Sequence, residues 1–385
     1  MRGIIKNVIL IACILIIFSC ESIIKEKEKP LLEDETLIIK EKKQLLKKNS
    51  FVSQLNDPSL GRDESERNNE LKFDTLKSID PKAVHILDIY GREELDGFLE
   101  LSPTFSSLEK LSVINVPMNY SLFDTLMSKL EDKPHLKKLM IHSCELKKLP
   151  STIAKLQGLE VLKLFRNPLA KIPPEIGLMK ELREIYFYNA YQLKAIPPEL
   201  GQLKKLEMLQ FAGTRVEILP AEISNCKKLW HITANANRLK SLPPEIGLCS
   251  SLRYLNIGAN KIKTLPPEIG NLTELDNLSL GYNQLSELPE TFKNLKKLTY
   301  LTMGDNQFSV FPKEILELHS LFTFWIHKNR LKSFPVELGN LQNLEYLMID
   351  HSVMNKENLG KLMAMKPQLS IRGADSKKIE LSSFE

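Results

Sequence analysis

The hydrophobic and polar positions of this chain follow a repeating pattern. In residues 252–274, LRYLNIGANKIKTLPPEIGNLTE, apolar side chains recur at fixed places, and one polar residue, Asn260, keeps its place in most copies. Each step between copies is 23 residues, except one step of 24. The copies begin at Leu136, Leu159, Leu182, Leu206, Leu229, Leu252, Leu275, Leu298, Leu321 and Leu344. Repeats of this length indicate an array of stacked units rather than separate globular domains.

Each unit predicts one short strand and one turn-rich return. Leu255 and Ile257 alternate with Tyr254, Asn256 and Gly258, which is the period of a strand with one buried face. Such a strand cannot bury its apolar face alone, so neighbouring units must stack with their strands parallel. Pro-Pro pairs, as in PPEIG, follow many strands and favour short helical turns on the outer side. We therefore predict an α/β solenoid, an arc whose concave side is a parallel sheet of about 13 short strands.

The segments beside the regular repeats predict the ends of this solenoid. Residues 82–135 have irregular spacing and indicate N-terminal capping repeats with helices on the outer side, one of them capped by Ser121. Regular repeats occupy residues 136–352, and residues 353–373 are expected to form a C-terminal cap. Residues 374–385 are expected to form a disordered tail.

The start of the chain has the features of an exported protein. A basic start precedes an apolar run at residues 8–18, which is too short to span a bilayer and is typical of a signal peptide over residues 1–19. The following Cys20 and the residues before it resemble the lipobox of bacterial lipoproteins in a relaxed, spirochaete-type form. The resemblance implies that Cys20 carries lipid and holds the protein in the cell envelope, with the outer membrane as the expected place. Residues 21–81 are rich in Lys and Glu and are expected to form a charged flexible tether.

A column of asparagines is predicted to be structural. The column lies where the chain leaves each strand, so the amides can bond backbone groups that would otherwise be buried without partners. In the 24-residue unit, Asn189 is expected to stand in for Ala190 through a local bulge. Smaller donors are expected in three units, at Cys144, Thr214 and Ser352. The column itself is Asn167, Asn237, Asn260, Asn283, Asn306 and Asn329.

The units match the pattern LxxLxLxxNxLxxLPxxIxxLxx, and over residues 82–372 the chain resembles the leucine-rich-repeat family. The resemblance implies a right-handed solenoid whose concave sheet binds other proteins. With the lipobox, the chain is similar to a bacterial leucine-rich-repeat lipoprotein that captures a protein partner, for example a host protein, at the cell envelope. The alternative that the sequence leaves open is a structural envelope protein that self-associates without an external ligand.

Two aromatic clusters are the candidate binding sites on the concave face. Side chains at exposed strand positions form three tracks across the sheet, and aromatic residues, which dominate many protein interfaces, gather near both ends. The first aromatic cluster is Val161, Phe165, Tyr186 and Tyr188, and the second aromatic cluster is Tyr300, Trp325, His327, Tyr346 and Met348. Between them the third track runs Ala212, Asn235, Gly258, Gly281 and Gly304, which predicts a shallow floor of bare backbone. The central repeat is therefore expected to be mainly scaffold.

Charge and motifs argue against other classes of function. The 53 basic and 48 acidic residues give a net charge of +5, which is too balanced for a protein that binds nucleic acid. No Gly-rich phosphate loop, GxSxG elbow or HExxH pair occurs, so we expect no enzyme activity and no cofactor. His327, Asp350 and His351 are the only weak candidate for a metal site, and we expect no metal there.

The three cysteines of the repeats occupy core positions. Cys144, Cys226 and Cys249 are an odd number, so they imply no disulfide framework. Cys226 and Cys249 are 23 residues apart and fall in adjacent coils, so a bridge between them stays open for an exported protein.

Overall fold

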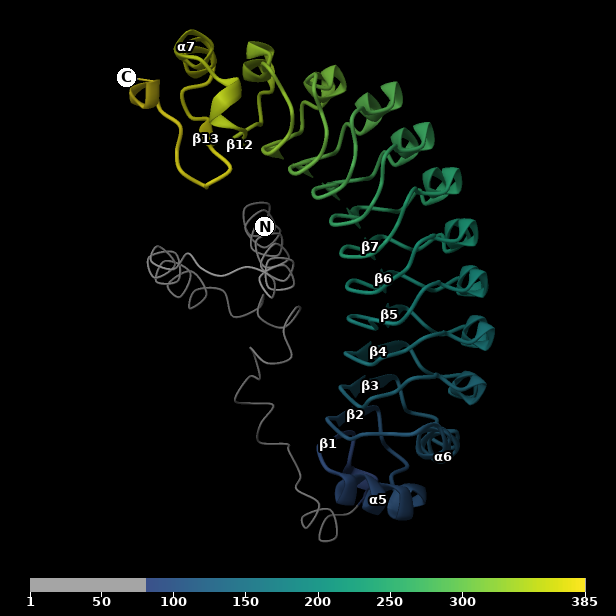
Figure 1. The fold of residues 1–385 in the computed structure, drawn as a ribbon. Coiled ribbons are helices and arrows are strands. Elements are labelled where there is room, and N and C mark those ends of the chain that lie inside the picture. Colours follow the sequence, from purple (N-terminus) through teal and green to yellow (C-terminus); the bar gives the residue numbers. More distant parts are fainter. Residues whose placement is uncertain (1–80, 385) are drawn as a thin grey trace. The chain divides into compact units, whose positions relative to one another are not determined.

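The structure, a computed structural model, describes residues 81–384. Within them, 13 parallel strands form one sheet in the order of the sequence. Figure 1 shows the strands along the inner side of an open arc and the short helices along its outer side. The predicted α/β solenoid with a concave parallel sheet is thus confirmed. The strands are β1 (Ile86–Ile89), β2 (Lys110–Ile114), β3 (Lys138–His142), β4 (Val161–Phe165), β5 (Glu184–Tyr186), β6 (Met208–Gln210), β7 (His231–Thr233), β8 (Tyr254–Asn256), β9 (Asn277–Ser279), β10 (Tyr300–Thr302), β11 (Thr323–Trp325), β12 (Tyr346–Met348) and β13 (Ser370–Arg372).

Short 3-10 helices (η) return the chain on the outer side. Before η8, for example, Pro266 is extended at φ −67° and ψ 144°, and Pro267 is the first helical residue. The fixed φ of proline suits both places, and its missing N–H has no partner to lose in a first turn. The 3-10 helices are η1 (Pro81–Ala83), η2 (Ser102–Thr104), η3 (Ser151–Lys155), η4 (Pro174–Leu178), η5 (Pro198–Gln202), η6 (Ala221–Asn225), η7 (Pro244–Leu248), η8 (Pro267–Asn271), η9 (Glu290–Asn294), η10 (Lys313–Glu317), η11 (Val336–Asn340), η12 (His351–Val353) and η13 (Leu381–Phe384).

Longer α-helices occur at both ends of the repeat array. The first coils carry α5 (Arg92–Leu101) and α6 (Tyr120–Leu130), and α7 (Lys356–Met365) precedes the last strand. The cap of α6 is not Ser121 but Asn119, whose Oδ1 accepts from the Leu122 N–H at 2.8 Å. The helix therefore begins two residues earlier than its apolar spacing indicates, because the asparagine side chain satisfies one of its first free N–H groups.

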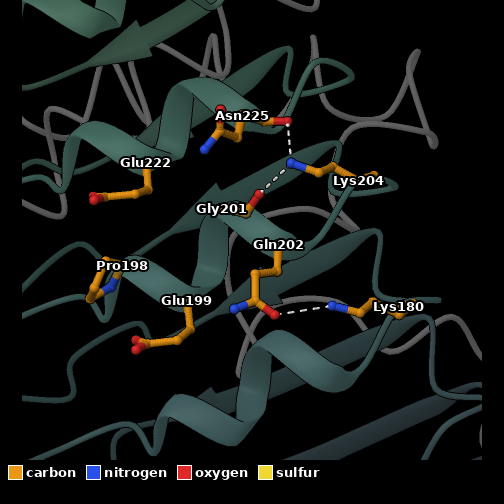
Figure 2. Close-up of a pocket in the computed structure, with 8 residues that line it drawn as sticks. All are labelled: Lys180, Pro198, Glu199, Gly201, Gln202, Lys204, Glu222 and Asn225. Atoms are coloured by element: carbon orange, nitrogen blue, oxygen red, sulfur yellow. Dashed lines mark hydrogen bonds between the residues drawn. The ribbon is translucent and has the colours of Figure 1, made fainter.

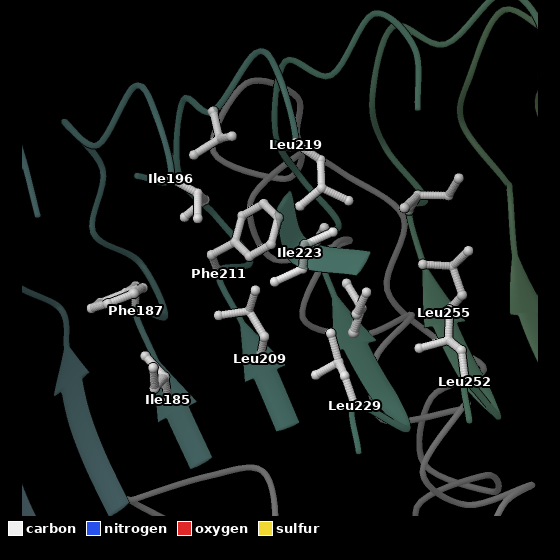
Figure 3. Packing of buried hydrophobic residues seen from close by; sticks show 14 of the residues in the cluster. Ile185, Phe187, Ile196, Leu209, Phe211, Leu219, Ile223, Leu229, Leu252 and Leu255 are labelled. Carbon is white, nitrogen blue, oxygen red and sulfur yellow. The ribbon is translucent and has the colours of Figure 1, made fainter. Parts of the chain in front are cut away.

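The core is a continuous column of apolar side chains between the sheet and the outer turns (Figure 3). Residues that follow the strands point into it, and Phe187 and Phe211 occupy the place that Ile257 holds in the regular repeat. Ala234 takes this place in the coil next to Phe211. A small residue beside a large one keeps the summed volume close to that of two aliphatic side chains, so the coils can keep their spacing.

Glycines allow consecutive outer turns to approach closely. A Cβ added to Gly177 in η4 would lie 2.5 Å from the carbonyl oxygen and 3.1 Å from the carbonyl carbon of Glu199 in η5. Gly201, Gly247 and Gly270 face the next turn at still shorter range. The glycine of the EIG and ELG turns therefore sets the distance between coils, a role that was not predicted from the sequence.

The C-terminal residues fold back on the last coil, which differs from the disordered tail predicted for residues 374–385. Arg372 of β13 forms an antiparallel bridge with Lys378, and the Ile379 N–H donates to the Ile371 carbonyl at 2.9 Å. Ile379 is only 4% exposed. Burial of this side chain offsets the cost of ordering the segment, and the fold-back covers one edge of the sheet.

The predicted signal peptide, the Cys20 anchor and nearly all of the tether lie outside the described residues. Among residues 81–384, no helix has both the length and the apolar character needed to cross a membrane.

Candidate functional site: the concave face of the sheet

The second aromatic cluster is partly brought together by β10, β11 and β12. The Trp325 ring packs edge-on against Tyr300, with centroids 5.8 Å apart, and lies 6.4 Å from the His327 ring. Tyr346 packs instead against Phe322, at 5.4 Å, and is 38% exposed. Trp325, His327 and Met348 are half-buried. The accessible part of this cluster is therefore Trp325, Tyr346 and Met348, on two adjacent strands.

The first aromatic cluster is a more tightly packed layer. Phe165 contacts Tyr186 and Tyr188, with ring centroids 5.9 and 6.4 Å apart. The Tyr186 hydroxyl donates to Glu184 Oε2 at 2.8 Å, and the Lys163 ammonium lies 4.7 Å from the Tyr186 ring centroid. Burial, with the negative charge and the hydrogen bond of Glu184, raises the pKa of Tyr186 far above its usual value. This tyrosine is thus a neutral donor fixed within the layer.

Three residues of the two clusters are more buried than their place on an exposed track predicted. Val161 and Tyr186 are each 7% exposed, and Tyr300 is 4% exposed. Parallel strands lie only about 4.8 Å apart, so a large side chain on one strand packs over its neighbours on the next. The prediction of exposure was wrong for these three, and Phe165, Tyr188, Trp325, Tyr346 and Met348 are the more accessible members.

The floor of bare backbone predicted along the third track is covered at Gly304. A Cβ there would lie 2.6 Å from Cε1 of His327, so this imidazole, two residues after the end of β11, rests directly on the glycine. Burial lowers the pKa of His327 to about 4, so the ring is neutral near pH 7. The missing side chain of Gly304 therefore leaves space for the His327 ring, and His327 in turn contacts Trp325.

A central aromatic cluster was missed by the sequence analysis. It consists of Trp230, His231 and Tyr254. The His231 ring stacks on Tyr254, with centroids 4.2 Å apart and planes at 20°, and Trp230 meets His231 edge-on at 5.2 Å. Burial lowers the pKa of His231 to about 4, which keeps the stacked ring uncharged. Trp230 precedes its strand by one residue and so lies outside the three tracks. A tryptophan next to a strand in the sequence could nevertheless have indicated this cluster.

The asparagine column bonds the backbone where each coil turns. Asn260 Oδ1 accepts from the Leu239 N–H at 2.9 Å, and Nδ2 donates to the carbonyls of Ala234, Ile257 and Gly258 at 3.0, 3.0 and 3.1 Å. Each amide thus joins its own coil to the preceding one. Equivalent bonds are made by Asn167, Asn237, Asn283, Asn306 and Asn329.

The comparisons with known proteins agree with this arrangement. A family profile described as a leucine-rich repeat region matches residues 244–369. The chain is similar to an internalin from Listeria monocytogenes, with 20% sequence identity over 76% of this chain and 87% of that one, at a TM-score of 0.61. The fold is a leucine-rich-repeat solenoid. No curated protein matches the chain.

Two plant receptors contain a similar leucine-rich-repeat solenoid. A plant peptide hormone receptor, RGFR1, solved in complex with RGF2, has 23% identity over 74% of this chain and 45% of its own length, at a TM-score of 0.57. The ectodomain of GASSHO1/SCHENGEN3 from Arabidopsis thaliana was solved in complex with CASPARIAN STRIP INTEGRITY FACTOR 2. It has 26% identity over 74% of this chain and 34% of its own length, at a TM-score of 0.57. This chain therefore spans less than half the length of either plant receptor.

The smaller donors predicted in place of asparagine are found in two of the three units. Cys144 and Thr214 do act as smaller donors, to backbone carbonyls 3.2–3.3 Å away. At the last coil the predicted donor Ser352 is exposed, and the Asp350 carboxylate accepts from the Lys328 and Asn329 N–H groups at 2.9 and 3.3 Å. In regular coils the equivalent amides bond backbone carbonyls of the next coil, so Asp350 replaces those backbone acceptors and not the asparagine amide.

Asp350 also belongs to the weak metal candidate with His327 and His351. Its oxygens are committed to backbone amides, and residues 81–384 contain no group of three or more His, Cys, Asp or Glu side chains placed to hold a metal ion.

The bulge predicted in the 24-residue unit takes another form. Asn189 adopts a positive φ of 55°, but its side chain makes no hydrogen bond in the described structure, so it does not stand in for Ala190. The Ala190 N–H instead bonds the Phe187 carbonyl at 3.2 Å. Gly213, at φ 68°, leaves the space that the Asn189 amide fills. The extra residue is therefore absorbed by a tight turn rather than by a replacement amide.

The repeat cysteines are buried thiols. Cys144, Cys226 and Cys249 are free in the structure. Burial raises the pKa of each thiol to about 11, which disfavours the reactive thiolate. Cys226 donates instead to the Leu200 carbonyl at 3.3 Å.

A shallow depression of about 540 Å³ lies between two outer turns of the solenoid (Figure 2). Its lysines are both hydrogen-bonded: Lys204 donates to the carbonyls of Gly201 and Asn225, at 2.9 and 3.3 Å, and Lys180 donates to the Gly177 carbonyl at 2.5 Å and to the Gln202 side chain at 3.2 Å. These bonds tie the end of one turn to the next turn, so the depression is a seam between coils and not a candidate binding site.

Proposed function

We propose that this chain binds a protein partner through its concave face, with the second aromatic cluster as the main contact. The observation that carries the proposal is the group of accessible apolar and aromatic side chains, Trp325, Tyr346 and Met348, on adjacent strands of the sheet. Trp and Tyr are the residues most often found at the energetic centres of interfaces. The leucine-rich-repeat neighbours solved with bound ligands support the same reading.

The packing behind this contact also favours binding. Trp325 is held on one side by Tyr300 and on the other by His327, which itself rests on Gly304. A side chain that is fixed before a partner arrives loses little freedom on binding, so more of its contact energy appears as affinity.

Replacing both Trp325 and Tyr346 with Ala is expected to weaken partner capture at least about thirtyfold, because interface hot spots of this type are each worth about 2 kcal/mol. The measurement is a pull-down from host or envelope extract, followed by a binding titration with the partner identified by mass spectrometry. The Y120A/Y191A variant is a matched control, since both tyrosines are about half exposed, at 51% and 49%, outside the three strand tracks. Unchanged capture by a folded W325A/Y346A variant would remove the second cluster from the interface.

The same variants test the self-associating alternative. Size-exclusion chromatography at several concentrations would show concentration-dependent assembly if the concave face receives another copy of the chain. If W325A/Y346A abolishes this assembly, the concave face binds another copy of the chain. That result would support a structural envelope role over the binding of an external ligand.

We further propose that the protein is anchored by lipid at Cys20 in a bacterial cell envelope, on the pattern of its first 20 residues. Incorporation of labelled palmitate in a bacterial host is expected to be lost in Cys20→Ser and kept in Cys13→Ser, which changes the other cysteine of the same segment. Loss of label from both variants, or from neither, would contradict the assignment of Cys20. Protease accessibility on intact cells then tests exposure at the outer surface, which two acyl chains would make stable.

A further inference from the structure

Three lysines lie close together on the first third of the concave face. Lys110 of β2 and Lys138 of β3 are register partners, and Lys163 of β4 lies two residues beyond the partner of Lys138. Among residues 81–384, none of the three is found in an ion pair with an acidic side chain. Like charges opposite each other on neighbouring strands are destabilising, so the fold itself gains nothing from this arrangement.

Lys163 lies within electrostatic reach of the other two lysines. Burial lowers the pKa of this ammonium group, the Glu184 carboxylate opposes that shift, and Lys110 and Lys138 lower the pKa further. Its remaining contact is with the face of the Tyr186 ring. A negative group above β2–β4 would relieve this repulsion.

Two buried polar side chains beside the lysines have no hydrogen-bond partner. Ser112 of β2 is 0% exposed, and its Oγ is unbonded. His142 at the end of β3 is 9% exposed, and both of its ring nitrogens are unbonded. Asp88 Oδ1, on the register partner of Ser112, is also buried and unbonded, so an acceptor for the Ser112 hydroxyl lies on the neighbouring strand. Buried polar groups are nearly always satisfied, so His142 is the group that favours an external acceptor. Burial and the charge of Arg166 lower the pKa of His142, so it would donate as a neutral ring.

The positive patch has defined limits along the sheet. Asp88 on β1 and Glu184 on β5 stand on either side of it. From β6 to β11 the strand positions facing the concave side carry no charged residue. They are Met208, Gln210, His231, Thr233, Tyr254, Asn256, Asn277, Ser279, Tyr300, Thr302, Thr323 and Trp325. An acidic ligand group is therefore favoured over β2–β4 and not over β6–β11.

We propose that Lys110, Lys138 and Lys163, with His142 beside them, receive an acidic stretch of the partner polypeptide through its Asp and Glu carboxylates. This inference rests on the proposed function and orients the partner on the sheet. Its acidic stretch lies over β2–β4 and its apolar contact over β11 and β12, about 40 Å away at the strand spacing of about 4.8 Å. Lysine ammonium groups and neutral O–H and N–H donors are the groups that carboxylates accept from most strongly.

The test uses the full-length protein and a fluorescein-labelled hexaglutamate peptide, with binding followed by fluorescence anisotropy at low and physiological salt. Saturable binding is expected to weaken about tenfold in K110Q/K138Q/K163Q, since each partly exposed charge contact contributes a modest amount. The matched control is K261Q/K263Q/K332Q, which removes three exposed lysines outside the patch and makes the same change in net charge. Its binding is expected to stay within about twofold of wild type.

Equal weakening by the two triple variants would show a general attraction to positive charge and would overturn the inference. So would an absence of hexaglutamate binding to the wild type. Heparin or inorganic phosphate that binds the patch when hexaglutamate does not would assign it to a sulfated or phosphorylated ligand instead. The peptide assay needs no natural partner, so it is independent of the capture experiment. A negative peptide assay would not affect the conclusion from W325A/Y346A, and a negative W325A/Y346A experiment would not affect the conclusion on the lysines.

Discussion

Replacing Asn260 with Ala is expected to destabilise the protein by about 3 kcal/mol or more, because it leaves the buried Leu239 N–H and several carbonyls without partners. The side chain is 9% exposed, so water cannot replace the lost bonds. In a solenoid each coil is stabilised mainly by its neighbours, so a fault in a central coil weakens both halves. Urea unfolding followed by circular dichroism measures the effect.

Asn271→Ala is the matched control for this change. Asn271 ends η8, is exposed, and its side chain makes no hydrogen bond in the described structure. A surface substitution of this kind is expected to change stability by less than about 0.5 kcal/mol. Asn260→Thr is expected to fall between Ala and wild type, because Thr214 already fills the equivalent place and bonds the Phe211 carbonyl at 3.2 Å. Equal stability of Asn260→Ala and Asn271→Ala would contradict a structural role for the column.

The repeat pattern is what made the fold predictable. Because Leu255 and Ile257 recur every 23 residues with the same polar neighbours, one unit fixes strand, turn and register for the whole array. The asparagine column followed from the same reasoning, since a turn buried between coils must have its backbone groups bonded. At the ends the pattern is lost, and there the prediction missed Asn119 as a cap, Asp350 as an acceptor and the fold-back around Ile379.

The candidate site was less predictable because exposure depends on neighbours and not on track position. Tyr300 and Tyr346 occupy the same track two strands apart, yet Tyr300 is 4% exposed and Tyr346 is 38% exposed. Contacts that cross from one coil to the next decide such differences, as His327 over Gly304 shows. The lysine patch was visible as Lys138 and Lys163 in two separate tracks, but only the strand register placed them with Lys110.

Both proposed contacts depend on a constant spacing of the coils. The apolar contact spans β11 and β12, and the positive patch spans β2–β4, so a partner that touches both needs the coils between them to be rigid. On the outer side that spacing is set by the EIG and ELG glycines, and on the inner side by the sheet and the asparagine column.

Replacing Gly177 with Ala is therefore expected to destabilise the protein by about 2–3 kcal/mol, in the range of overpacked cores. The new Cβ would lie 2.5 Å from the Glu199 carbonyl oxygen, and a backbone group cannot rotate away as a flexible side chain can. Ser224 holds the equivalent place between η6 and η7. Two neighbouring outer turns can therefore accommodate a Cβ at this position when they lie slightly farther apart. This limits the expected loss of stability.

Gly360→Ala, in α7, is the control for the Gly177 change. Its Cβ would meet only Leu381 Cδ2, at an ordinary 3.9 Å, so the same substitution inside a helix is expected to be neutral or to stabilise by about 0.5–1 kcal/mol. Thermal unfolding should thus separate two chemically identical changes, lowering the melting temperature for Gly177→Ala only. If Gly177→Ala leaves the melting temperature unchanged, the outer turns can separate freely, and coil spacing must be set by the sheet alone.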